Sequence, residues 1–268
     1  MNYFPGRIVS LQPSATVTLH ALGVVDRVVA CTKYCLDVVP ELSGSDRIIV
    51  HDSWTAQAQQ ILAAEPELVI ASVPYQEKAV IEILKAAIPF LALAPRSLED
   101  VYRDTAMIAG VVGVPERAEK LIGQMQSEIE RVRAHAPKRK LRVYCEEWGK
   151  PLVHSQRWVA ELVEAAGGEF IGEPGKQATA DAVRAADPEV IVAAWCGAGD
   201  RVPLEKIVRE RKWEQTSAAK NGRVYCVRDE YLNTPAITLL AGLRALAYFL
   251  NPEMGDAPHG VRQIAVIK

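Results

Sequence analysis

The nine residues AAEPELVIA at 63–71 return in nearly the same form as AADPEVIVA at 185–193, 122 positions further along the chain (185 − 63). In each copy a segment with helical spacing runs into an acidic residue and then a proline. Because proline disfavours the helical conformation in the residue before it, the helix must end there. An apolar, β-branched run follows, as long as a strand buried on both faces. Each copy therefore predicts a helix, a tight turn and a central parallel strand.

Similar apolar runs surround both copies and alternate with helix-like segments. In the first half of the chain they lie at 7–11, 27–31, 47–50, 68–71 and 90–94, and in the second half at 141–145, 168–172, 190–194 and 223–227. Strands that alternate with helices in this way are typical of parallel sheets with right-handed crossovers. We therefore expect an α/β fold of two Rossmann-like, three-layer lobes with mostly parallel sheets.

A spacer of about forty residues, 97–136, separates the two sets of strands and carries apolar side chains at helical spacing. It predicts one helix that breaks at 113–115 and a longer helix after the break. The expected organisation is an N-terminal lobe at 1–95, a bridging helix at 96–137 and a C-terminal lobe at 138–268. One continuous large sheet is the alternative that the strand pattern leaves open.

Composition and charge exclude several classes of function. The chain has 268 residues, 49% hydrophobic and 24% charged, which is typical of a globular protein. Its formal net charge is −2 without long runs of like charge, so we expect no nucleic-acid partner. Since no apolar stretch reaches the ~18 residues of a membrane-spanning helix, we expect no membrane insertion. A monomer is the expected state.

The beginning of the sequence and its cysteines bear on the compartment. Residues 1–14 lack the basic, apolar and cleavage regions of a secretory signal. The five cysteines are odd in number and widely spaced, which does not indicate a disulfide framework. Both observations favour a cytoplasmic protein if Met1 is the native start. A chain trimmed of its signal would instead be periplasmic or otherwise extracytoplasmic.

Aromatic residues follow six of the predicted strands. Because open α/β sheets bind ligands at the carboxyl ends of their strands, these rings are candidates to line a ligand site. Six of the seventeen aromatic residues are placed in this way: Tyr34, Trp54, Tyr75, Trp148, Trp195 and Tyr231. So much ring area at one edge indicates a large, flat, partly apolar ligand. Ordinary packing of each ring against a neighbouring loop is the alternative.

The segment RIVSLQPSATVTLHALGVVDRVVACTKYC at 7–35 resembles the opening of the substrate-binding proteins of metal-chelate ABC importers. This helical-backbone family includes cobalamin-, haem- and siderophore-binding proteins, and the chain is most similar to the cobalamin-binding branch. The similarity continues through 51–71, 152–171, 185–193 and 239–253. The resemblance implies two lobes bridged by a long helix, a ligand held between them and no catalytic cofactor.

The family's ligand contacts carry over to positions of this chain. The resemblance implies ring contacts to a corrin from Tyr34, Trp54, Trp148 and Tyr231, and a cleft position for Trp195. Polar neighbours are candidates to hydrogen-bond the ligand's amide groups: His51, Asp52, Glu147, Arg228 and Asp229. The expected function is thus non-catalytic binding of a corrinoid such as cobalamin by aromatic side chains of both lobes. Binding of haem or a ferric siderophore for an ABC importer is the alternative within the family.

The resemblance also implies a partner, an ABC permease. Family members that dock on a permease carry a surface glutamate on each lobe, seven residues before the repeated proline. Counting back from Pro66 and Pro188 gives Gln59 and Asp181, so one acid is replaced and the other is a methylene shorter. A lost charge-assisted contact is worth about 1.5–3 kcal/mol. These docking positions therefore favour an intracellular chelate binder that acts without the usual permease.

Metal ligation by the protein has weak candidates. Cys31, Cys35 and His51 fall at predicted strand ends and are soft or borderline ligands for zinc or for an axial position on cobalt. Their spacing is not that of a zinc site. Cys145 and Cys226 lie inside apolar strands and are expected to be small buried hydrophobic residues.

Catalysis has less support in the sequence. Glycine-rich phosphate loops and the nucleophile-elbow motif are absent from it. Two α/β lobes can also build enzymes, so a chelatase-like or reductase-like enzyme acting on a tetrapyrrole or corrinoid is the alternative from another class. Its first titratable candidates are Glu146, Glu147 and Asp229.

Overall fold

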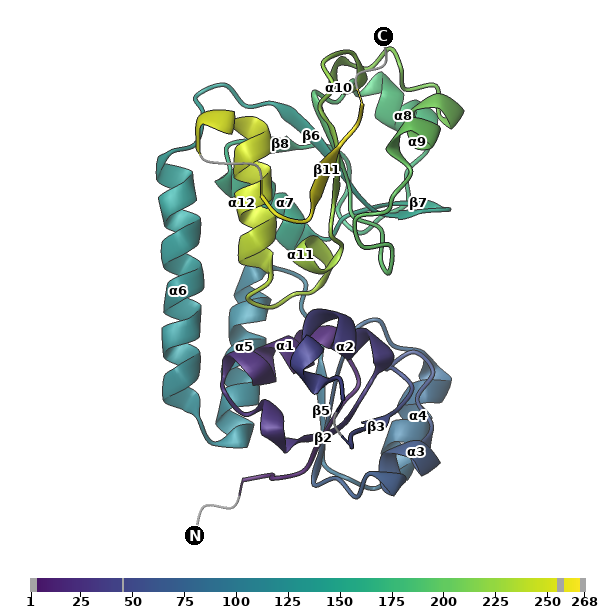
Figure 1. Ribbon diagram of the computed structural model, residues 1–268, viewed down its shortest axis with the longest axis vertical. Coiled ribbons are helices and arrows are strands. Elements are labelled where there is room, and N and C mark those ends of the chain that lie inside the picture. The colour runs from purple at the N-terminus through teal and green to yellow at the C-terminus, as the bar shows by residue number, and fades with distance from the viewer. Residues whose placement is uncertain (1–3, 45, 255–257, 266–268) are drawn as a thin grey trace. The chain divides into compact units, whose positions relative to one another are not determined.

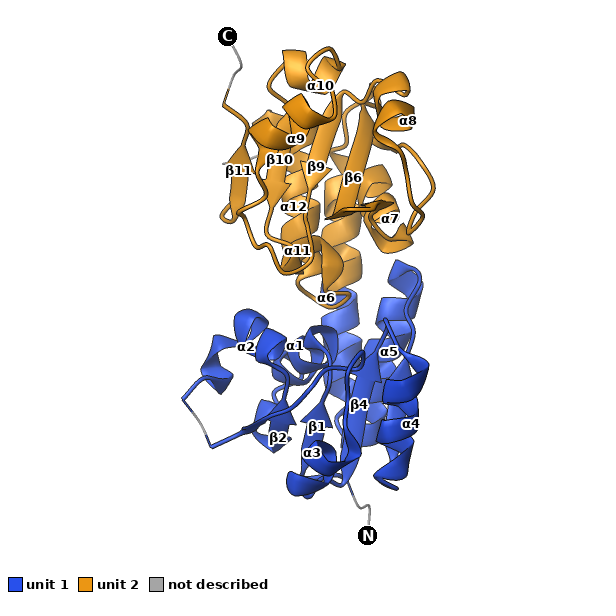
Figure 2. Cartoon of the chain, turned by 90° about the vertical axis from the view of Figure 1, so that its right-hand side faces the viewer, with its two compact units in different colours: residues 1–124 blue, residues 125–268 orange. Residues whose placement is uncertain are grey.

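The computed structural model describes residues 4–44, 46–254 and 258–265 of the chain. Two compact units divide it, unit 1 at 1–124 and unit 2 at 125–268 (Figure 2).

Unit 1 is built on a five-stranded, all-parallel sheet with strand order β3-β2-β1-β4-β5 (Figure 1). The strands are β1 (Ile8–Ser10), β2 (Val28–Cys31), β3 (Ile48–Ile49), β4 (Leu68–Ser72) and β5 (Phe90–Leu93). The helices are α1 (Pro13–Ala21), α2 (Lys33–Val38), α3 (Ala58–Ala63), α4 (Glu77–Lys85) and α5 (Leu98–Val112), with 3₁₀ turns η1 (Val25–Arg27) and η2 (Pro40–Leu42). Helices α3 and α4 share one apolar core with β1, β2 and β4. Helices α1 and α5 pack together, and α1 also contacts β1 and β4. The sheet therefore lies between two groups of helices, α3 with α4 and α1 with α5, which gives three layers.

Unit 2 has a sheet of strand order β11-β10-β9-β6-β7, with β8 also paired to β6. The strands are β6 (Arg142–Gly149), β7 (Leu152–His154), β8 (Glu169–Phe170), β9 (Val190–Ala193), β10 (Val224–Val227) and β11 (Val261–Gln263). The helices are α7 (Arg157–Ala165), α8 (Ala180–Ala185), α9 (Leu204–Glu210), α10 (Ser217–Lys220), α11 (Glu230–Asn233) and α12 (Leu239–Leu250), followed by η3 (Pro252–Met254). Helices α8, α9 and α10 share one core with the sheet, and α7 packs on α12.

Two mostly parallel sheets with helices on both sides confirm the predicted α/β class, and the single large sheet is wrong. Every predicted strand is present. Two strands were missed, β7 and β11, which pair antiparallel at the edges of the unit 2 sheet. Both are three residues long and lack an apolar run, so neither shows the pattern of a buried strand.

The segment between the two sheets contains α5 and a longer helix, α6 (Pro115–Ala134). Helix α5 begins with a capping box at Ser97 and ends at Gly113, which has the left-handed conformation (φ 79°) that ends helices. The division between the units falls within α6, at Gln124.

The repeated phrase has the same backbone in both units. Helices α3 and α8 each span six residues, and the acid before the proline has a positive φ of 45° at both Glu65 and Asp187. Strands β4 and β9 follow, and every residue in them is buried, as predicted for central strands. The turn thus converts a helix into a central strand twice in one chain.

An arginine holds this turn in unit 1. Arg7, directly before β1, donates from Nε to the Glu65 carbonyl and from a terminal guanidinium nitrogen to the Ala64 carbonyl, both at 2.7 Å. In the opposite direction, the Glu67 carboxylate accepts from the backbone N–H groups of Gly6 (2.6 Å) and Arg7 (3.2 Å). The end of α3 and the start of β1 are therefore tied by four hydrogen bonds.

Unit 2 repeats the arrangement with different atoms. Arg142, the first residue of β6, donates twice to the Asp187 carbonyl, at 3.1 and 2.8 Å. The Glu189 carboxylate accepts from the Arg142 backbone N–H at 3.1 Å. The Asp187 carboxylate accepts from the backbone and hydroxyl of Ser217, and these bonds lower its pKa. The turn is therefore also joined to α10.

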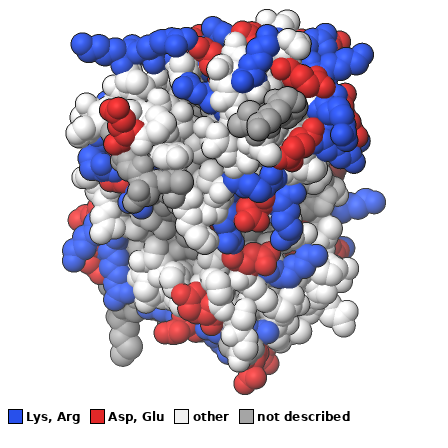
Figure 3. All heavy atoms as spheres, turned by 45° about the horizontal axis from the view of Figure 1, so that its top comes forward, with Lys and Arg blue, Asp and Glu red and all other residues white. Residues whose placement is uncertain are grey.

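Charged side chains of both signs are mixed on the face of the molecule shown in Figure 3, in keeping with the formal net charge of −2. Elsewhere among the described residues, exposed charges pair along a helix, such as Arg184 with Asp181 at 2.8 Å and Lys206 with Glu210 at 3.8 Å. Exposed pairs of this kind contribute little to stability.

Substitution of Arg142 by methionine should lower the free energy of unfolding by about 2 kcal/mol, because two charge-assisted bonds to a backbone carbonyl are lost. Urea denaturation followed by tryptophan fluorescence measures the change. The control is Lys120→Met, an exposed position on α6. Equal stability of the two variants would contradict a structural role for the arginine.

Candidate functional site

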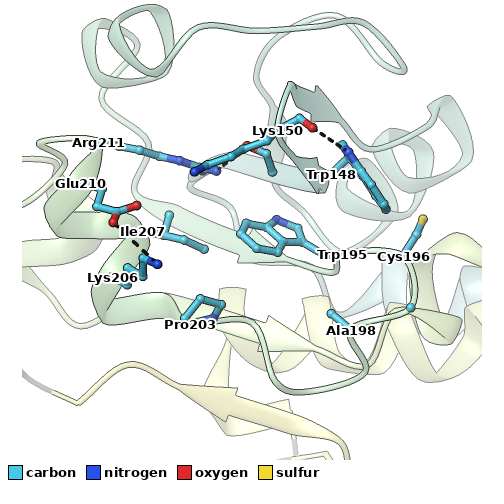
Figure 4. A pocket seen from close by; sticks show the side chains of 12 residues that line it. Trp148, Lys150, Trp195, Cys196, Ala198, Pro203, Lys206, Ile207, Glu210 and Arg211 are labelled. Atoms are coloured by element: carbon cyan, nitrogen blue, oxygen red, sulfur yellow. Dashed lines mark hydrogen bonds and ion pairs between the residues drawn. The ribbon is translucent and has the colours of Figure 1, made fainter.

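Unit 2 contains a pocket of about 400 Å³ at the carboxyl ends of β6 and β9 (Figure 4). Its walls come from the turn between β6 and β7, the loop after β9 and helix α9. The lining residues are Trp148, Gly149, Lys150, Trp195, Cys196, Gly197, Ala198, Pro203, Lys206, Ile207, Glu210 and Arg211. Two of the six aromatic residues predicted for the ligand site, Trp148 and Trp195, thus line one pocket.

The two indoles are held differently. Trp148 is 46% exposed, and its Nε1 donates to the Lys150 carbonyl at 2.9 Å. Trp195 is partly buried and donates from Nε1 to Glu146 at 2.7 Å. Its ring lies against Gly149, where an added Cβ would approach the indole to 2.3 Å. Only glycine leaves room for the ring there, so Gly149 fixes the position of Trp195.

A buried ion pair forms the base of the pocket. Glu146 is 1% exposed, and Arg211 donates to both of its carboxylate oxygens, at 3.0 and 2.7 Å. Tyr144 donates to the same carboxylate at 2.6 Å, and Arg211 also bonds the Gly149 carbonyl at 3.1 Å. Burial and the neighbouring Glu146 raise the pKa of Tyr144, so its hydroxyl stays protonated and donates. Every charge in this network has a partner, as burial requires.

The arginine also supports aromatic rings. Its guanidinium carbon lies 4.8 Å from the ring of Trp213 and 5.9 Å from the ring of Trp195. Cation–π contacts of this kind favour a fixed ring orientation. Arg211, which lines the pocket in Figure 4, thereby connects the pocket wall to the buried carboxylate of Glu146.

Glu147, the next residue on β6, lies in different surroundings. Burial raises its pKa to about 7, partly offset by a hydrogen bond of 2.6 Å from Gln156. Burial and the charges of Glu147 and Asp229 raise the pKa of the Cys196 thiol to about 12. The thiol, which accepts from Asn233 at 3.3 Å, is therefore protonated at neutral pH. Glu147 is the group of this cluster whose charge changes near neutral pH.

Three other predicted residues of unit 2 have structural contacts. The Asp229 carboxylate accepts from the backbone N–H groups of Gly197 (2.8 Å) and Gly199 (2.9 Å), so it holds the loop after β9 that lines the pocket. Arg228 is paired with Glu230. Tyr231 is partly buried and is the second residue of the short helix α11, after Glu230. None of the three is among the residues that line the pocket.

Unit 1 presents two rings at the carboxyl edge of its sheet. Tyr34, on α2 after β2, is 40% exposed, and Trp54, in the loop after β3, is 44% exposed. The Asp52 carboxylate holds the second loop because it accepts from the Trp54 and Thr55 backbone N–H groups (3.1 and 3.0 Å) and the Thr55 hydroxyl (2.9 Å). His51 is exposed in the same loop.

Three further predicted residues of unit 1 are partly or fully buried. The Tyr75 hydroxyl exchanges hydrogen bonds of 3.1 Å with the Leu93 carbonyl and N–H, and burial raises its pKa. Cys31 and Cys35 have no exposed surface. Cys35 lies 3.2 Å from the Thr32 hydroxyl at the start of α2. Their burial does not support these thiols as metal ligands, because Cys31 at the end of β2 and Cys35 in the first turn of α2 both lie in the core.

Cys145 and Cys226 are fully buried, as predicted. In the described part of the chain, no three His, Cys, Asp or Glu side chains lie together as a metal ion would require. Nor does any helix within those ranges have the length and hydrophobicity needed to cross a membrane.

The two positions counted back from the repeated prolines are structurally equivalent. Gln59 and Asp181 are each the second residue of a six-residue helix, α3 or α8, and both are exposed. Asp181 pairs with Arg184 at 2.8 Å. Gln59 carries no charge, so the two units present different chemistry at the same structural position.

Sequence reasoning missed the contribution of α9 to the pocket. Lys206, Ile207, Glu210 and Arg211 all come from this helix or its end. Their only signal in the sequence is charged residues four positions apart at 206 and 210, which form an ion pair of 3.8 Å. Such spacing is common on exposed helices and does not mark a pocket.

Two α/β units with aromatic side chains at the carboxyl ends of their strands define a two-lobed ligand-binding protein. A family model described as periplasmic binding protein matches residues 8–231, and the chain belongs to this family. The family consists of binding proteins of ABC importers, so the chain is a substrate-binding protein and the enzyme alternative is not supported.

Curated relatives match this chain over most of their own length. An uncharacterised ABC transporter substrate-binding lipoprotein, YvrC of Bacillus subtilis, is 24% identical over 264 residues, covering 93% of this chain and 81% of the relative. A vitamin B12-binding protein of Vibrio cholerae is 24% identical over 259 residues, covering 92% and 90%.

Solved structures share the fold. A periplasmic heme-binding protein from Pseudomonas aeruginosa has a TM-score of 0.84 at 19% identity and covers 99% of this chain and 100% of its own. The periplasmic vitamin B12-binding protein BtuF of Vibrio cholerae has a TM-score of 0.74 at 20% identity, covering 94% and 99%.

Arg211→Met should lower the free energy of unfolding by about 3–5 kcal/mol, because it leaves the Glu146 charge buried without its cation. Chemical denaturation measures the loss. The matched control is the double variant Glu146→Gln/Arg211→Met, which removes the charge as well and should be more stable than the single variant. A double variant less stable than Arg211→Met would contradict this reading of the pair.

Glu147→Gln should change how stability depends on pH. The folded-state pKa of about 7 lies above the ordinary glutamate pKa of 4.5, so the carboxyl ionises first in the unfolded chain. Stability from this group is complete below about pH 4.5 and is lost as the pH rises to 7, by an amount of the order of 2–3 kcal/mol. The glutamine variant should therefore gain stability over the wild type across this range. Denaturation of both proteins at each pH tests this, and parallel curves would refute it.

Proposed function

We propose that the chain binds a corrinoid, such as cobalamin, or a closely related metal chelate, without catalysing a reaction on it. One observation carries the proposal: Tyr34, Trp54 and Trp148 expose 40–46% of their surface at the carboxyl ends of strands. Folded proteins rarely expose large rings unless a partner covers them. Aromatic faces bind flat, partly apolar ligands, and a metal chelate of the tetrapyrrole type has this form.

The relatives support a corrinoid as the first candidate. Several of the similar curated proteins are named vitamin B12-binding or cobalamin-binding proteins. Haem is the second candidate, since the heme-binding structure from Pseudomonas aeruginosa matches the whole chain with a TM-score of 0.84. Stacking alone separates these ligands poorly because both present a wide conjugated or partly conjugated ring.

The pocket in unit 2 supports recognition of one substituent on the rim of the chelate. Its volume of about 400 Å³ is at the small end of ligand sites, so we assign it to one peripheral substituent of the chelate. Trp148 and Trp195 supply its apolar surface, and Lys150 and Lys206 lie in its lining. A substituent with an apolar body and a polar or anionic end matches this combination.

Membership of the family makes an ABC permease the expected protein partner. The geometry favours weak docking, because Gln59 is neutral and the Asp181 carboxylate already pairs with Arg184. An exposed pair of this kind is worth little, so it does not prevent Asp181 from changing partner. We propose one charged docking contact, on unit 2, where the family has two.

Trp54→Ala should weaken binding of hydroxocobalamin about 10-fold or more, a loss of about 1.4 kcal/mol or more, because one stacking face is removed. Isothermal titration calorimetry measures this without relying on the substituted fluorophore. Leu84→Ala is the control, since Leu84 is 61% exposed but lies on α4, away from the strand ends. Failure of both hydroxocobalamin and haemin to bind the wild type would refute the proposal.

A further inference from the structure

His51 lies in the loop after β3, and its imidazole is exposed. The ring Nδ1 is 3.1 Å from the backbone carbonyl of Thr55. A carbonyl oxygen only accepts hydrogen bonds, so Nδ1 must carry the hydrogen. In the neutral imidazole, Nε2 then has a free lone pair, which is the form that binds metals.

The loop that carries His51 is fixed on several sides. The backbone N–H of His51 donates to the Gln60 side chain at 3.1 Å. The buried Ser53 hydroxyl donates to the carbonyls of Ser72 (2.9 Å) and Pro74 (3.0 Å), and it accepts from Gln12 at 2.6 Å. These bonds anchor the loop to the carboxyl end of β4. The donor atom is thus held in place before any ligand arrives.

Thr55 is held as firmly as the histidine that it orients. Its N–H and hydroxyl both donate to the Asp52 carboxylate, which also accepts from the Trp54 N–H. Metal-binding histidines commonly donate their second ring N–H to a backbone carbonyl or carboxylate, which fixes the tautomer and increases the basicity of the ligating nitrogen. His51 has this arrangement in the same loop as the exposed indole of Trp54.

The other candidate donors are less suited. Cys31 and Cys35 are fully buried in unit 1. Cys196 is exposed in unit 2, but burial of its thiol group and nearby acids raise its pKa to about 12. Ligation by Cys196 would therefore require loss of a tightly held proton. At His51 the hydrogen bond from Nδ1 to the Thr55 carbonyl leaves Nε2 as the ring nitrogen that can ligate a metal.

We propose that His51 Nε2 is the axial ligand to the central metal of the bound chelate. This inference rests on the proposed function and narrows its substrate class to cobalt or iron chelates with an exchangeable axial position. The step is a ligand exchange in which the Nε2–metal bond forms, the metal–water bond breaks and the water leaves. No electron or proton is transferred.

The experiment compares aquocobalamin, whose axial water exchanges, with cyanocobalamin, whose cyanide does not exchange readily, and runs haemin as the iron arm. The wild type should bind aquocobalamin at least ~10-fold more tightly than cyanocobalamin and shift its visible spectrum. His51→Ala should remove both the shift and the preference while cyanocobalamin still binds. Free imidazole added to this variant should restore the shift.

Two variants serve as controls. His20→Ala removes another exposed histidine of unit 1, and Cys196→Ser removes the competing donor. Neither should change the spectrum.

Equal affinity for the two corrinoids with no spectral shift overturns the inference and leaves the proposed function standing. A spectral shift that is lost only in Cys196→Ser has the same meaning. A shift with haemin alone, dependent on His51, supports the inference with iron as the metal. No binding of any of the three refutes both.

Discussion

The fold depends on a turn in which a helix ends and a central strand begins after only four intervening residues, 64–67 in unit 1 and 186–189 in unit 2. Proline prevents the helix from continuing, and the acid before it takes a left-handed conformation at Glu65 and Asp187. The helix carbonyls exposed by this turn are bonded by Arg7 and Arg142, which stand at the start of the neighbouring strands. Since β1 pairs with β4 and β6 with β9, the same contacts align both central strand pairs, and therefore their carboxyl ends.

The two units use this common frame for different surfaces. Strand β1 stops after three residues, and the carboxyl edge of unit 1 exposes Tyr34 on α2 and Trp54 in the loop after β3. Strand β6 continues to Gly149 and turns back as β7, which adds a wall beside the loop after β9. That wall allows Trp195 to be partly buried against Gly149, and the pocket forms next to it. The difference in length between β1 and β6 thus accounts for the exposed surface in unit 1 and the pocket in unit 2.

The central strands β4 and β9 could be predicted from sequence because burial on both faces requires an apolar run. The break between α5 and α6 could be predicted because Gly113 and Pro115 are local signals. The edge strands β7 and β11 could not be predicted, since edge pairing imposes no such pattern.

For the site, the strand-end rule identified Tyr34, Trp54 and Trp148, which are exposed. The same rule also selected Tyr75, but the hydroxyl of this residue bonds the backbone of Leu93. The direction of a side chain after a strand depends on packing, which the sequence does not display.

Two adjacent acids on β6, Glu146 and Glu147, also have surroundings that could not be predicted from the sequence. Glu146 and Glu147 look alike in the sequence, yet the pleat of the strand directs them to opposite faces. Glu146 meets Arg211, 65 residues away, and becomes part of the pocket base. Glu147 meets the neutral Gln156, and without a cation its burial raises the pKa to about 7. The pocket base therefore keeps a compensated charge while the neighbouring carboxyl is neutral or charged according to pH.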